Sequence, residues 1–421
     1  MAKFSVQKSA PLSGEVTISG AKNAVLPLMA ATLLSHDECI ISDVPELADV
    51  TVMRKILESI GSEIQEPVRS VLKIRTEHVK TTEPDNDLVG MMRASFVVMG
   101  PLLGREGHAK LYRPGGCSIG ARPIDLHLKG FKALGAEITI TDDYIEAKAP
   151  EGGLVGAAIY LDFPSVGATE NIMMAAVLAN GTTYIENAAE EPEITDLANL
   201  INKMGGRIKG AGTDNIKIEG VPSLHGAEHT VIPDRIEAGT FMLAAAITRG
   251  QLLLRNITPD HLKPVTAKLR ECGVTVELGD EGMYVIADDR ELTSTDIKTM
   301  PYPGFPTDIQ SPFMAFLTTV YGSSTVIETV FENRFMHVAE LNRMGANIEI
   351  IGNRATIRGG RKLRGTSVIA TDLRAGAAMV LAGLVAEGET QVSEIYHIER
   401  GYEDFIEKFR TIGANIRRID G

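Results

Sequence analysis

A short glycine segment recurs six times along the chain and constrains the fold more than any other feature. Each copy has an apolar residue, the glycine, a residue that is usually small, any residue, and a second apolar residue. The glycines are Gly61, Gly135, Gly205, Gly273, Gly345 and Gly413, and the spacing between successive copies is nearly constant. Six repeats of roughly 70 residues therefore account for the whole chain.

Each repeat has the same order of predicted elements. A helix rich in small apolar residues is followed by a short β-branched strand, for example at 182–186. A second, amphipathic helix, as at 193–204, ends at the repeat glycine, where a left-handed C-cap is expected. A β-hairpin follows, as at 136–147 with a turn near Asp142. The first helices are expected at 23–34, 92–103, 169–178, 238–247, 310–320 and 375–385.

This order, β-α-β-α-β-β in a cyclic frame, predicts an α/β protein. The last repeat ends at 416–419 with a single hairpin strand, whereas residues 4–18 are expected to form strands with a turn at Gly14. We therefore expect the N-terminal strands to complete the sixth repeat. A solenoid is disfavoured, because capping repeats are not evident and because helices and hairpins alternate within each repeat.

A chain of 421 residues is too long for one ordinary core, so two domains of three repeats each are expected. The first would span residues 20–229 and carry a loop around Cys117. The second would combine residues 1–19 with 230–421 and carry Asp308 and Arg400. The chain would then cross between the domains twice, with a cleft at the crossing.

Composition excludes several classes of protein. The net charge of −13 argues against a general nucleic-acid binder. Apolar runs such as 377–386 are too short to span a bilayer, and no secretory signal peptide is expected. The three cysteines form neither a disulfide framework nor a metal spacing, which fits a reducing cytoplasm. Of these, Cys39 in a predicted strand and Cys272 at a helix end are expected to be buried and inert.

The third cysteine, Cys117, lies in a segment rich in glycine and proline, which indicates irregular surface backbone. The neighbouring Arg113 and Arg122 are suited to lowering the pKa of its thiol. An exposed thiol between arginines indicates chemistry, whereas a chance cysteine in a flexible loop is the alternative interpretation.

Basic residues also recur near the predicted helix starts, where unpaired N–H groups and the helix dipole favour anions. A single arginine at such a place is usually solvated or structural, but the shared repeat position strengthens the group. In an acidic protein such a cluster predicts a substrate that carries phosphates and carboxylates. The residues that would converge with Cys117 are Lys22, Arg93, Arg122, Arg334, Arg374 and Arg400.

Over its full length the chain resembles the enolpyruvyl transferases of bacterial cell-wall synthesis. The motifs are Ser-Gly-Ala-Lys22-Asn23-Ala, Met-Arg93-Ala-Ser, Arg-Pro-Gly-Gly-Cys117-Ser-Ile-Gly-Ala-Arg122-Pro-Ile-Asp125-Leu-His127, Ser165-Val-Gly-Ala-Thr, Tyr-Pro-Gly-Phe-Pro-Thr-Asp308, Phe-Glu-Asn-Arg334-Phe-Met-His, Thr-Asp372-Leu-Arg374 and Arg400-Gly-Tyr. The resemblance implies two inside-out α/β barrel domains, built from six β-α-β-α-β-β repeats, that close on substrate.

The resemblance also implies a reaction. The 3′-hydroxyl of UDP-N-acetylglucosamine adds to C2 of phosphoenolpyruvate, and C3 gains a proton. The tetrahedral intermediate then loses inorganic phosphate and leaves an enolpyruvyl ether, in the first committed step of peptidoglycan synthesis. No cofactor is implied, and the sequence contains no P-loop and no dinucleotide fingerprint after a strand. The implied partners are these two substrates, without nucleic acid or membrane, for a cytoplasmic monomer or weak homo-oligomer.

Roles follow from the resemblance residue by residue. Cys117 would be the general acid at C3 of phosphoenolpyruvate, which requires a protonated thiol, and would also form a covalent adduct with it. Asp308 would bind the sugar 3′-hydroxyl and act as base, on either that hydroxyl or the methyl group of the intermediate. Lys22 and Arg400 would be catalytic cations that stabilise the changing charge. Phosphoenolpyruvate would be held by Lys22, Asn23, Arg122, Arg334, Arg374 and Arg400.

The nucleotide sugar would contact a second set of residues, with Asp372 as a polar neighbour of Cys117. One departure is Phe163, which stands where some relatives carry a lysine and supplies no charge to the diphosphate. The backbone or another basic side chain would have to replace that lysine. The implied contacts are Asn23, Arg93, Arg122, Pro123, Ile124, Asp125, Leu126, Ser165, Val166, Gly167, Asp308 and Val330.

Two alternatives stand beside this interpretation. A sibling enzyme transfers enolpyruvate to shikimate 3-phosphate, but the Gly-Gly loop before Cys117 favours the nucleotide sugar. A redox-regulatory paralogue would use Cys117 as a sensor thiol. The intact set of Lys22, Arg122, Asp308 and Arg400 argues against a site without activity.

Overall fold

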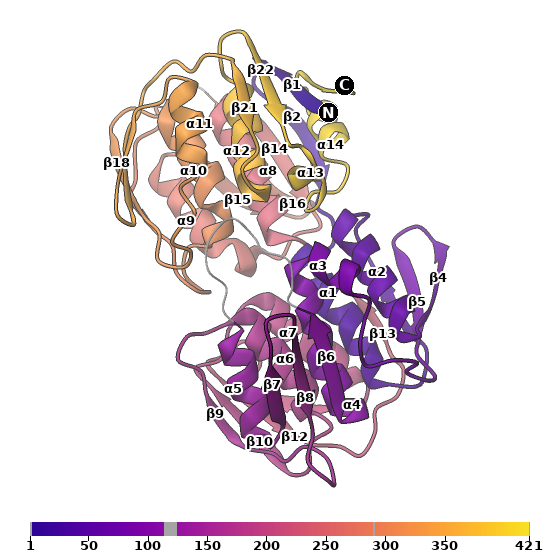
Figure 1. Ribbon diagram of the computed structural model, residues 1–421. Coiled ribbons are helices and arrows are strands. Elements are labelled where there is room, and N and C mark those ends of the chain that lie inside the picture. Colours follow the sequence, from indigo (N-terminus) through magenta and orange to yellow (C-terminus); the bar gives the residue numbers. More distant parts are fainter. Residues whose placement is uncertain (1, 113–123, 289–290, 421) are drawn as a thin grey trace. The chain divides into compact units, whose positions relative to one another are not determined.

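The computed structural model describes residues 2–112, 124–288 and 291–420. The described residues form two compact units, each with its own hydrophobic core (Figure 1). The N-terminal unit contains residues 20–112 and 124–232, and the C-terminal unit contains 2–19 and 233–420. No helix in the described parts of the chain is long and apolar enough to cross a bilayer.

The N-terminal unit contains three sheets among its described residues, with strand orders β13-β3-β5-β4, β11-β12-β10-β9 and β6-β8-β7. Its strands are β3 (Cys39–Ser42), β4 (Glu63–Val68), β5 (Val71–Arg75), β6 (His108–Tyr112), β7 (Glu137–Ile140), β8 (Tyr144–Lys148), β9 (Ala158–Tyr160), β10 (Thr182–Glu186), β11 (Arg207–Lys209), β12 (Asn215–Glu219) and β13 (Glu228–Thr230). Its helices are α1 (Lys22–Ala31), η1 (Thr32–Leu34), α2 (Ala48–Ile60), α3 (Asn86–Met91), η2 (Arg93–Val98), α4 (Met99–Glu106), α5 (Asp125–Ala133), α6 (Val166–Ala176) and α7 (Pro192–Lys203).

The C-terminal unit likewise has three sheets in its described part, with orders β15-β16-β14-β2, β17-β18-β20-β19 and β21-β22-β1-β23. Its strands are β1 (Lys3–Gln7), β2 (Ser13–Thr17), β14 (Gln251–Arg255), β15 (Thr275–Gly279), β16 (Gly282–Ile286), β17 (Ile297–Lys298), β18 (Ser323–Ile327), β19 (Ile348–Ile351), β20 (Arg354–Arg358), β21 (Ser367–Ile369), β22 (Glu389–Ser393) and β23 (Ile416–Ile419). Its helices are α8 (Arg235–Thr248), η3 (Pro259–Leu262), α9 (Lys263–Glu271), α10 (Thr307–Thr319), α11 (His337–Arg343), α12 (Leu373–Gly383), α13 (Tyr396–Glu399) and α14 (Phe405–Thr411).

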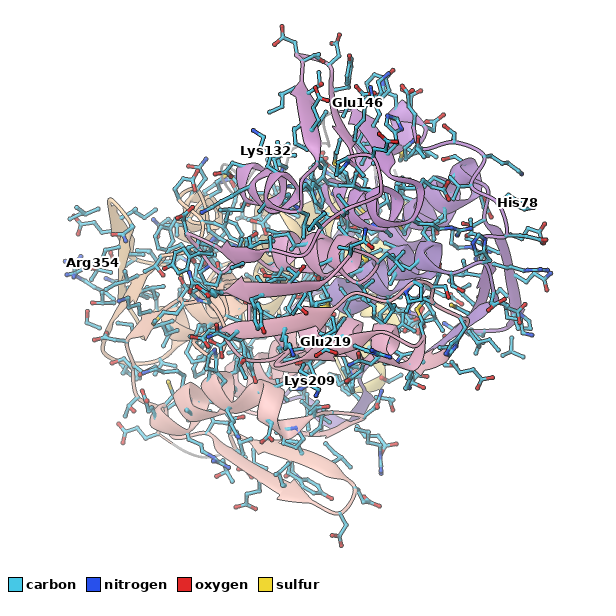
Figure 2. The ribbon with its side chains drawn as sticks, turned by 90° about the horizontal axis from the view of Figure 1, so that it is seen from below. His78, Lys132, Glu146, Lys209, Glu219 and Arg354 are labelled. Atoms are coloured by element: carbon cyan, nitrogen blue, oxygen red, sulfur yellow. The ribbon has the colours of Figure 1, made fainter. Side chains whose placement is uncertain are left out.

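The four-stranded sheets share one pairing pattern. In one of them β9 runs parallel to β10, and β10 pairs antiparallel with the hairpin of β11 and β12. The sheet of β17, β18, β20 and β19 repeats this pattern. Inner strands such as β10, β12, β18 and β20 alternate between a buried and an outward face, as expected for sheets with one solvated side. The charged side chains Lys209, Glu219 and Arg354 belong to β11, β12 and β20 of these sheets (Figure 2).

The small-residue helices are buried on almost every side. In α8, every residue from Ile236 to Thr248 is buried, and α8, α10 and α12 contact one another. A helix that is apolar all round belongs in the interior, which explains why these segments lack an amphipathic pattern. They lie at the centre of the C-terminal unit, among its strands (Figure 1).

The six repeat glycines end helices as predicted. All six have a positive φ, between 93° and 121°, which a side chain disfavours. The residue after each glycine donates its N–H to the carbonyl five positions earlier, as in Ala136 to Phe131 at 3.0 Å and Ala346 to Leu341 at 3.1 Å. These bonds form the Schellman cap, so the repeated glycine is explained by one local backbone requirement.

The N-terminal strands differ from the prediction in one respect. β1 pairs antiparallel with both β22 and β23, and so completes the last hairpin as expected. β2 instead pairs parallel with β14. The predicted turn at Gly14 is therefore wrong, because Gly14 lies within β2. The reason lies in the tertiary structure. In the sheets of β10, β18 and β22 the parallel neighbour is the strand before the preceding helix, but β13, which precedes α8 and β14, pairs with β3 instead. β2 therefore takes the parallel position beside β14.

Candidate active site

Asp308 lies between two buried arginines in the C-terminal unit. It is in the first turn of α10, after Pro306, which ends the preceding extended segment. One carboxylate oxygen, Oδ1, is 2.8 Å from Arg334 Nη1, and Oδ2 accepts from Nε and Nη2 of Arg374 at 3.3 Å. The arginine side chains are 3% and 1% exposed, whereas that of Asp308 is 24% exposed. The carboxylate is thus held from its buried side and remains accessible from the other.

Arg374 is itself held in place by its surroundings. Asp372 caps α12 by accepting from the backbone N–H groups of Arg374 at 2.8 Å and Ala375 at 3.0 Å. The guanidinium lies 5.0 Å from the ring centre of Tyr402. Burial alone would lower the pKa of Arg374, but Tyr402 and Asp308 raise it above its usual value. Arg374 therefore stays charged beside Asp308.

Two buried nitrogens of the guanidinium groups that hold this carboxylate have no hydrogen-bond partner among the described residues. They are Arg334 Nε and Arg374 Nη1. Buried polar atoms are normally paired, so unpaired ones beside an accessible carboxylate indicate that a ligand or water completes the site.

Two other predicted residues of this unit lie at the ends of elements. Arg400 follows α13 directly. The pKa of His397 is lowered mainly by burial, and the charge of Arg400 adds to that shift. Val330 comes shortly after β18, in the segment that leads to Arg334.

His337 begins α11 and lies near the same charged groups. Its pKa is lowered to about 4 mainly by burial. The charge of Asp372 opposes this shift, and the charge of Arg334 adds to it.

In the N-terminal unit, Lys22 begins α1 beside Asn23 and forms a buried ion pair. Its Nζ is 2.7 Å from Asp49 Oδ2, with side chains 11% and 5% exposed. Asp49 is not marked by any of the sequence motifs. The signal was its position, at the start of the second helix of the first repeat, the place that holds Arg334 and Arg400 in later repeats.

A second group in this unit forms around His127. Asn171 donates from Nδ2 to His127 Nδ1 at 2.9 Å, and a Cβ on Gly167 would come within 3.1 Å of the imidazole. Burial lowers the pKa of His127 to about 3, and the nearby charge of Arg93 adds to the shift. The His127 group therefore joins the starts of α5 and α6. It places Arg93 near the predicted contacts Ile124, Asp125, Leu126, Ser165, Val166 and Gly167.

Acidification is expected to destabilise the protein through His127. Its pKa is about 6.5 in the unfolded chain and about 3 in the folded one, so the unfolded chain binds more protons between these values. The contribution is present above pH 6.5 and falls by about 2 kcal/mol from pH 7 to pH 5. In urea unfolding at both pH values, His127→Gln should lose less stability on acidification than the unsubstituted protein. The exposed His225→Gln should keep the original pH dependence, and an unchanged slope in His127→Gln would contradict the assignment.

The region of Phe163 has a basic neighbour. Phe163 is 43% exposed, and the adjacent Asp162 accepts from Lys129 Nζ at 2.7 Å. Lys129 lies on α5, one turn after Asp125. It is thus a basic side chain close to the position that lacks the lysine.

Three predicted residues, Cys117, Arg122 and Pro123, lie outside the described residues. Within the described ranges, no group of three His, Cys, Asp or Glu side chains is arranged to hold a metal ion. An open groove of about 590 Å³ on the C-terminal unit, lined among others by Lys268, Lys298 and Arg354, contains none of the predicted site residues.

Comparison with known proteins places this geometry in context. Residues 6–409 match the family model described as EPSP synthase (3-phosphoshikimate 1-carboxyvinyltransferase). UDP-N-acetylglucosamine 1-carboxyvinyltransferase 1 of Caldanaerobacter subterraneus subsp. tengcongensis is 60% identical over 416 residues, which is 99% of each chain. UDP-N-acetylglucosamine 1-carboxyvinyltransferase of Finegoldia magna is 56% identical over 422 residues, covering 100% of this chain and 99% of the relative.

Solved structures extend the likeness to the fold. The enolpyruvyl transferase NikO from Streptomyces tendae superposes with a TM-score of 0.89 at 24% identity, covering 100% of this chain and 99% of that one. EPSP synthase from Acinetobacter baumannii gives a TM-score of 0.76 at 19% identity, with both chains covered completely. At these identities the likeness establishes a shared α/β fold.

Proposed function

The chain belongs to the EPSP synthase family, and on that premise we propose that it transfers the enolpyruvyl group of phosphoenolpyruvate to the 3′-hydroxyl of UDP-N-acetylglucosamine. Phosphate is released, in the first committed step of peptidoglycan synthesis. The observation that carries the proposal is the full-length identity of 60% and 56% to two UDP-N-acetylglucosamine 1-carboxyvinyltransferases.

The geometry around Asp308 supports the proposed chemistry. A carboxylate gripped by two arginines on its buried side and open on the other can accept a hydrogen bond from the sugar hydroxyl. Asp308 then takes a proton, from that hydroxyl during addition or from the methyl group of the intermediate during elimination. Arg334 and Arg374 balance the charge and fix the direction of the carboxylate, while Arg400 binds phosphoenolpyruvate.

The N-terminal unit contributes the other binding groups. Lys22, fixed by Asp49, presents an ammonium to the phosphate of phosphoenolpyruvate. Asn23 and Arg122 bind the same substrate. The nucleotide sugar is bound by residues at the helix starts that the His127 group joins, and Pro123 and Val330 belong to the same proposed set of contacts. Lys129 takes the place of the lysine that is absent at Phe163.

The finer architecture belongs to the same proposal. We infer two inside-out barrel domains of three repeats each, residues 20–229 and residues 1–19 with 230–421, in a cytoplasmic monomer or weak homo-oligomer. Three sheets per unit among the described residues, and the central helices of the C-terminal unit, support this arrangement.

Substituting Asp49 is expected to weaken phosphoenolpyruvate binding. Asp49→Asn keeps the size of the side chain but removes the charge that holds the Lys22 ammonium. The KM for phosphoenolpyruvate should rise by about tenfold, because an interaction of roughly 1.4 kcal/mol is lost. Steady-state phosphate release with varied phosphoenolpyruvate measures it. Asp142→Asn, in an exposed hairpin turn of the same unit, should leave KM unchanged, and an equal KM in Asp49→Asn would refute the role.

The proposed function is tested by phosphate release from phosphoenolpyruvate with each of two acceptors. Release is expected with UDP-N-acetylglucosamine and not with shikimate 3-phosphate. Activity with shikimate 3-phosphate alone would assign the chain to the sibling reaction. Release with neither acceptor would favour the redox-regulatory alternative and sink the proposal.

A further inference from the structure

Glu328 is a buried carboxylate that accepts hydrogen bonds from the residue before Asp308 and from the segment that leads to Arg334. It follows β18 directly and is 3% exposed. Its Oε1 accepts from Thr299 Oγ1 at 2.8 Å, from Val330 N–H at 2.8 Å and from Phe331 N–H at 3.1 Å. Its Oε2 accepts from Thr307 Oγ1 at 2.9 Å. Four donors from three segments of the C-terminal unit thus meet at one side chain.

All four contacts are neutral donors, and the described part of the chain has no ion pair to Glu328. Burying a carboxylate is costly unless hydrogen bonds compensate the lost water. An apolar residue at this position would avoid that cost. The presence of a carboxylate therefore indicates that its hydrogen bonds have a role in fixing the surrounding segments. It ties together the segment of Val330, the strand end at Thr299 and the start of α10 at Thr307.

The link to Asp308 passes through one hydroxyl. Thr307 has a single hydroxyl proton, which it donates to Glu328, so its lone pairs are left to accept from another donor. That donor is Arg334 Nη1, at 3.3 Å from Thr307 Oγ1. The same Nη1 is 2.8 Å from Asp308 Oδ1. Glu328 therefore sets the polarity of Thr307, and Thr307 steadies the guanidinium nitrogen that holds Asp308.

We propose that Glu328 is a positioning residue for the reaction, which orients Asp308 through Thr307 and Arg334 and holds the backbone at Val330. This inference rests on the proposed function, because it assigns the work of the base to Asp308. It predicts that breaking the link at Thr307 lowers turnover, whereas nucleotide-sugar binding persists as long as an oxygen still accepts from the N–H groups of Val330 and Phe331.

The direct test is Glu328→Gln, which keeps the shape of the side chain. If the amide oxygen stays on the N–H groups of Val330 and Phe331, the NH2 group faces Thr307. The hydroxyl proton of Thr307 must then turn away from residue 328, toward Arg334 Nη1. There it opposes the N–H that Arg334 donates to Thr307, and that hydrogen bond is lost. Turnover should fall by about 10-fold to 100-fold, as expected for a misplaced catalytic group, while the KM for UDP-N-acetylglucosamine changes less than about threefold.

Thr307→Val provides an independent variant that leaves Val330 untouched. It should lower kcat by a similar factor, and Thr307→Ser should restore it because the hydroxyl returns. Since Glu328→Gln and Thr307→Val break the same link, the double variant should be no slower than the slower single variant. Glu349→Gln, on the exposed β19 of the same sheet, is the matched control and should keep the original kcat.

The readouts separate positioning from mere stability. Each variant is first checked for its melting temperature and its binding of UDP-N-acetylglucosamine, and the pH dependence of kcat is then measured. A displaced Asp308 should move the acid limb of that profile, which a purely structural loss would not do. An unchanged kcat and pH profile in Glu328→Gln, or losses that multiply in the double variant, would overturn the inference. If the unsubstituted protein uses only shikimate 3-phosphate, the proposed function fails, and the same variants are compared on that acceptor.

Discussion

Replacing Asp308 with asparagine is expected to lower kcat by about a thousandfold, within the range attributed to general base catalysis. Asparagine fits the space and can still accept a hydrogen bond from Arg334, but it cannot take up a proton. Its NH2 group would also face either Arg334 or Arg374, so that two donors would meet. In the unsubstituted protein both carboxylate oxygens accept from these arginines. Both the proton acceptor and the balance of charge are lost together.

Phosphate release with saturating substrates measures this effect, and calorimetry with UDP-N-acetylglucosamine shows whether binding persists. We expect nucleotide-sugar affinity to fall much less than kcat. Asp280→Asn, at an exposed hairpin turn of the same unit, is the control for loss of an aspartate and should remain fully active. A kcat within about tenfold of the original in Asp308→Asn would be too small a loss for a general base.

Replacing Cys117 with alanine is expected to reduce turnover by about a hundredfold or more, since the methyl group cannot donate a proton to C3 of phosphoenolpyruvate. Binding of UDP-N-acetylglucosamine should persist. Steady-state kinetics gives the loss of kcat, and the dissociation constant of UDP-N-acetylglucosamine shows whether binding persists. Full activity in Cys117→Ala would remove the acid role and revive the sensor interpretation.

The other cysteines serve as internal controls for the same residue. Both are buried, and burial raises the pKa of the Cys39 thiol. Burial also raises the pKa of Cys272, to about 12, and the charge of Glu271 adds to this second shift. Neither thiol is therefore reactive near neutral pH. The epoxide fosfomycin should alkylate Cys117, and mass spectrometry should find the adduct there. An adduct on Cys39 or Cys272 instead would contradict the assignment.

The fold could be predicted where one residue determines the local backbone. Each repeat glycine adopts a positive φ that closes a Schellman cap within a short stretch of chain, so a sequence pattern suffices to find it. The small-residue helices are similar, since an unbroken apolar surface is compatible only with the interior. Gly14 shows the limit, because its strand is defined by its pairing with β14, which lies in a distant part of the chain.

The candidate site divides in the same way. Asp308, Arg334 and Arg374 could be singled out because motifs mark residue types, but the motifs did not predict that the two guanidinium groups would close on one carboxylate. Asp49 and Glu328 escaped notice, since an acidic residue at a helix start or strand end is usually a cap or a solvated group. Their partners come from other elements, and only the packed structure shows those contacts.

By itself the sequence determined the sixfold repeat, the helix ends and the types of charged group available for binding. These depend on backbone preferences and polarity, which act between close neighbours in the chain. The tertiary structure alone decided which charges pair: Lys22 with Asp49, and Asp308 with Arg334 and Arg374. Pairing depends on distances of about 3 Å between segments far apart in the chain, and packing of the whole unit sets those distances.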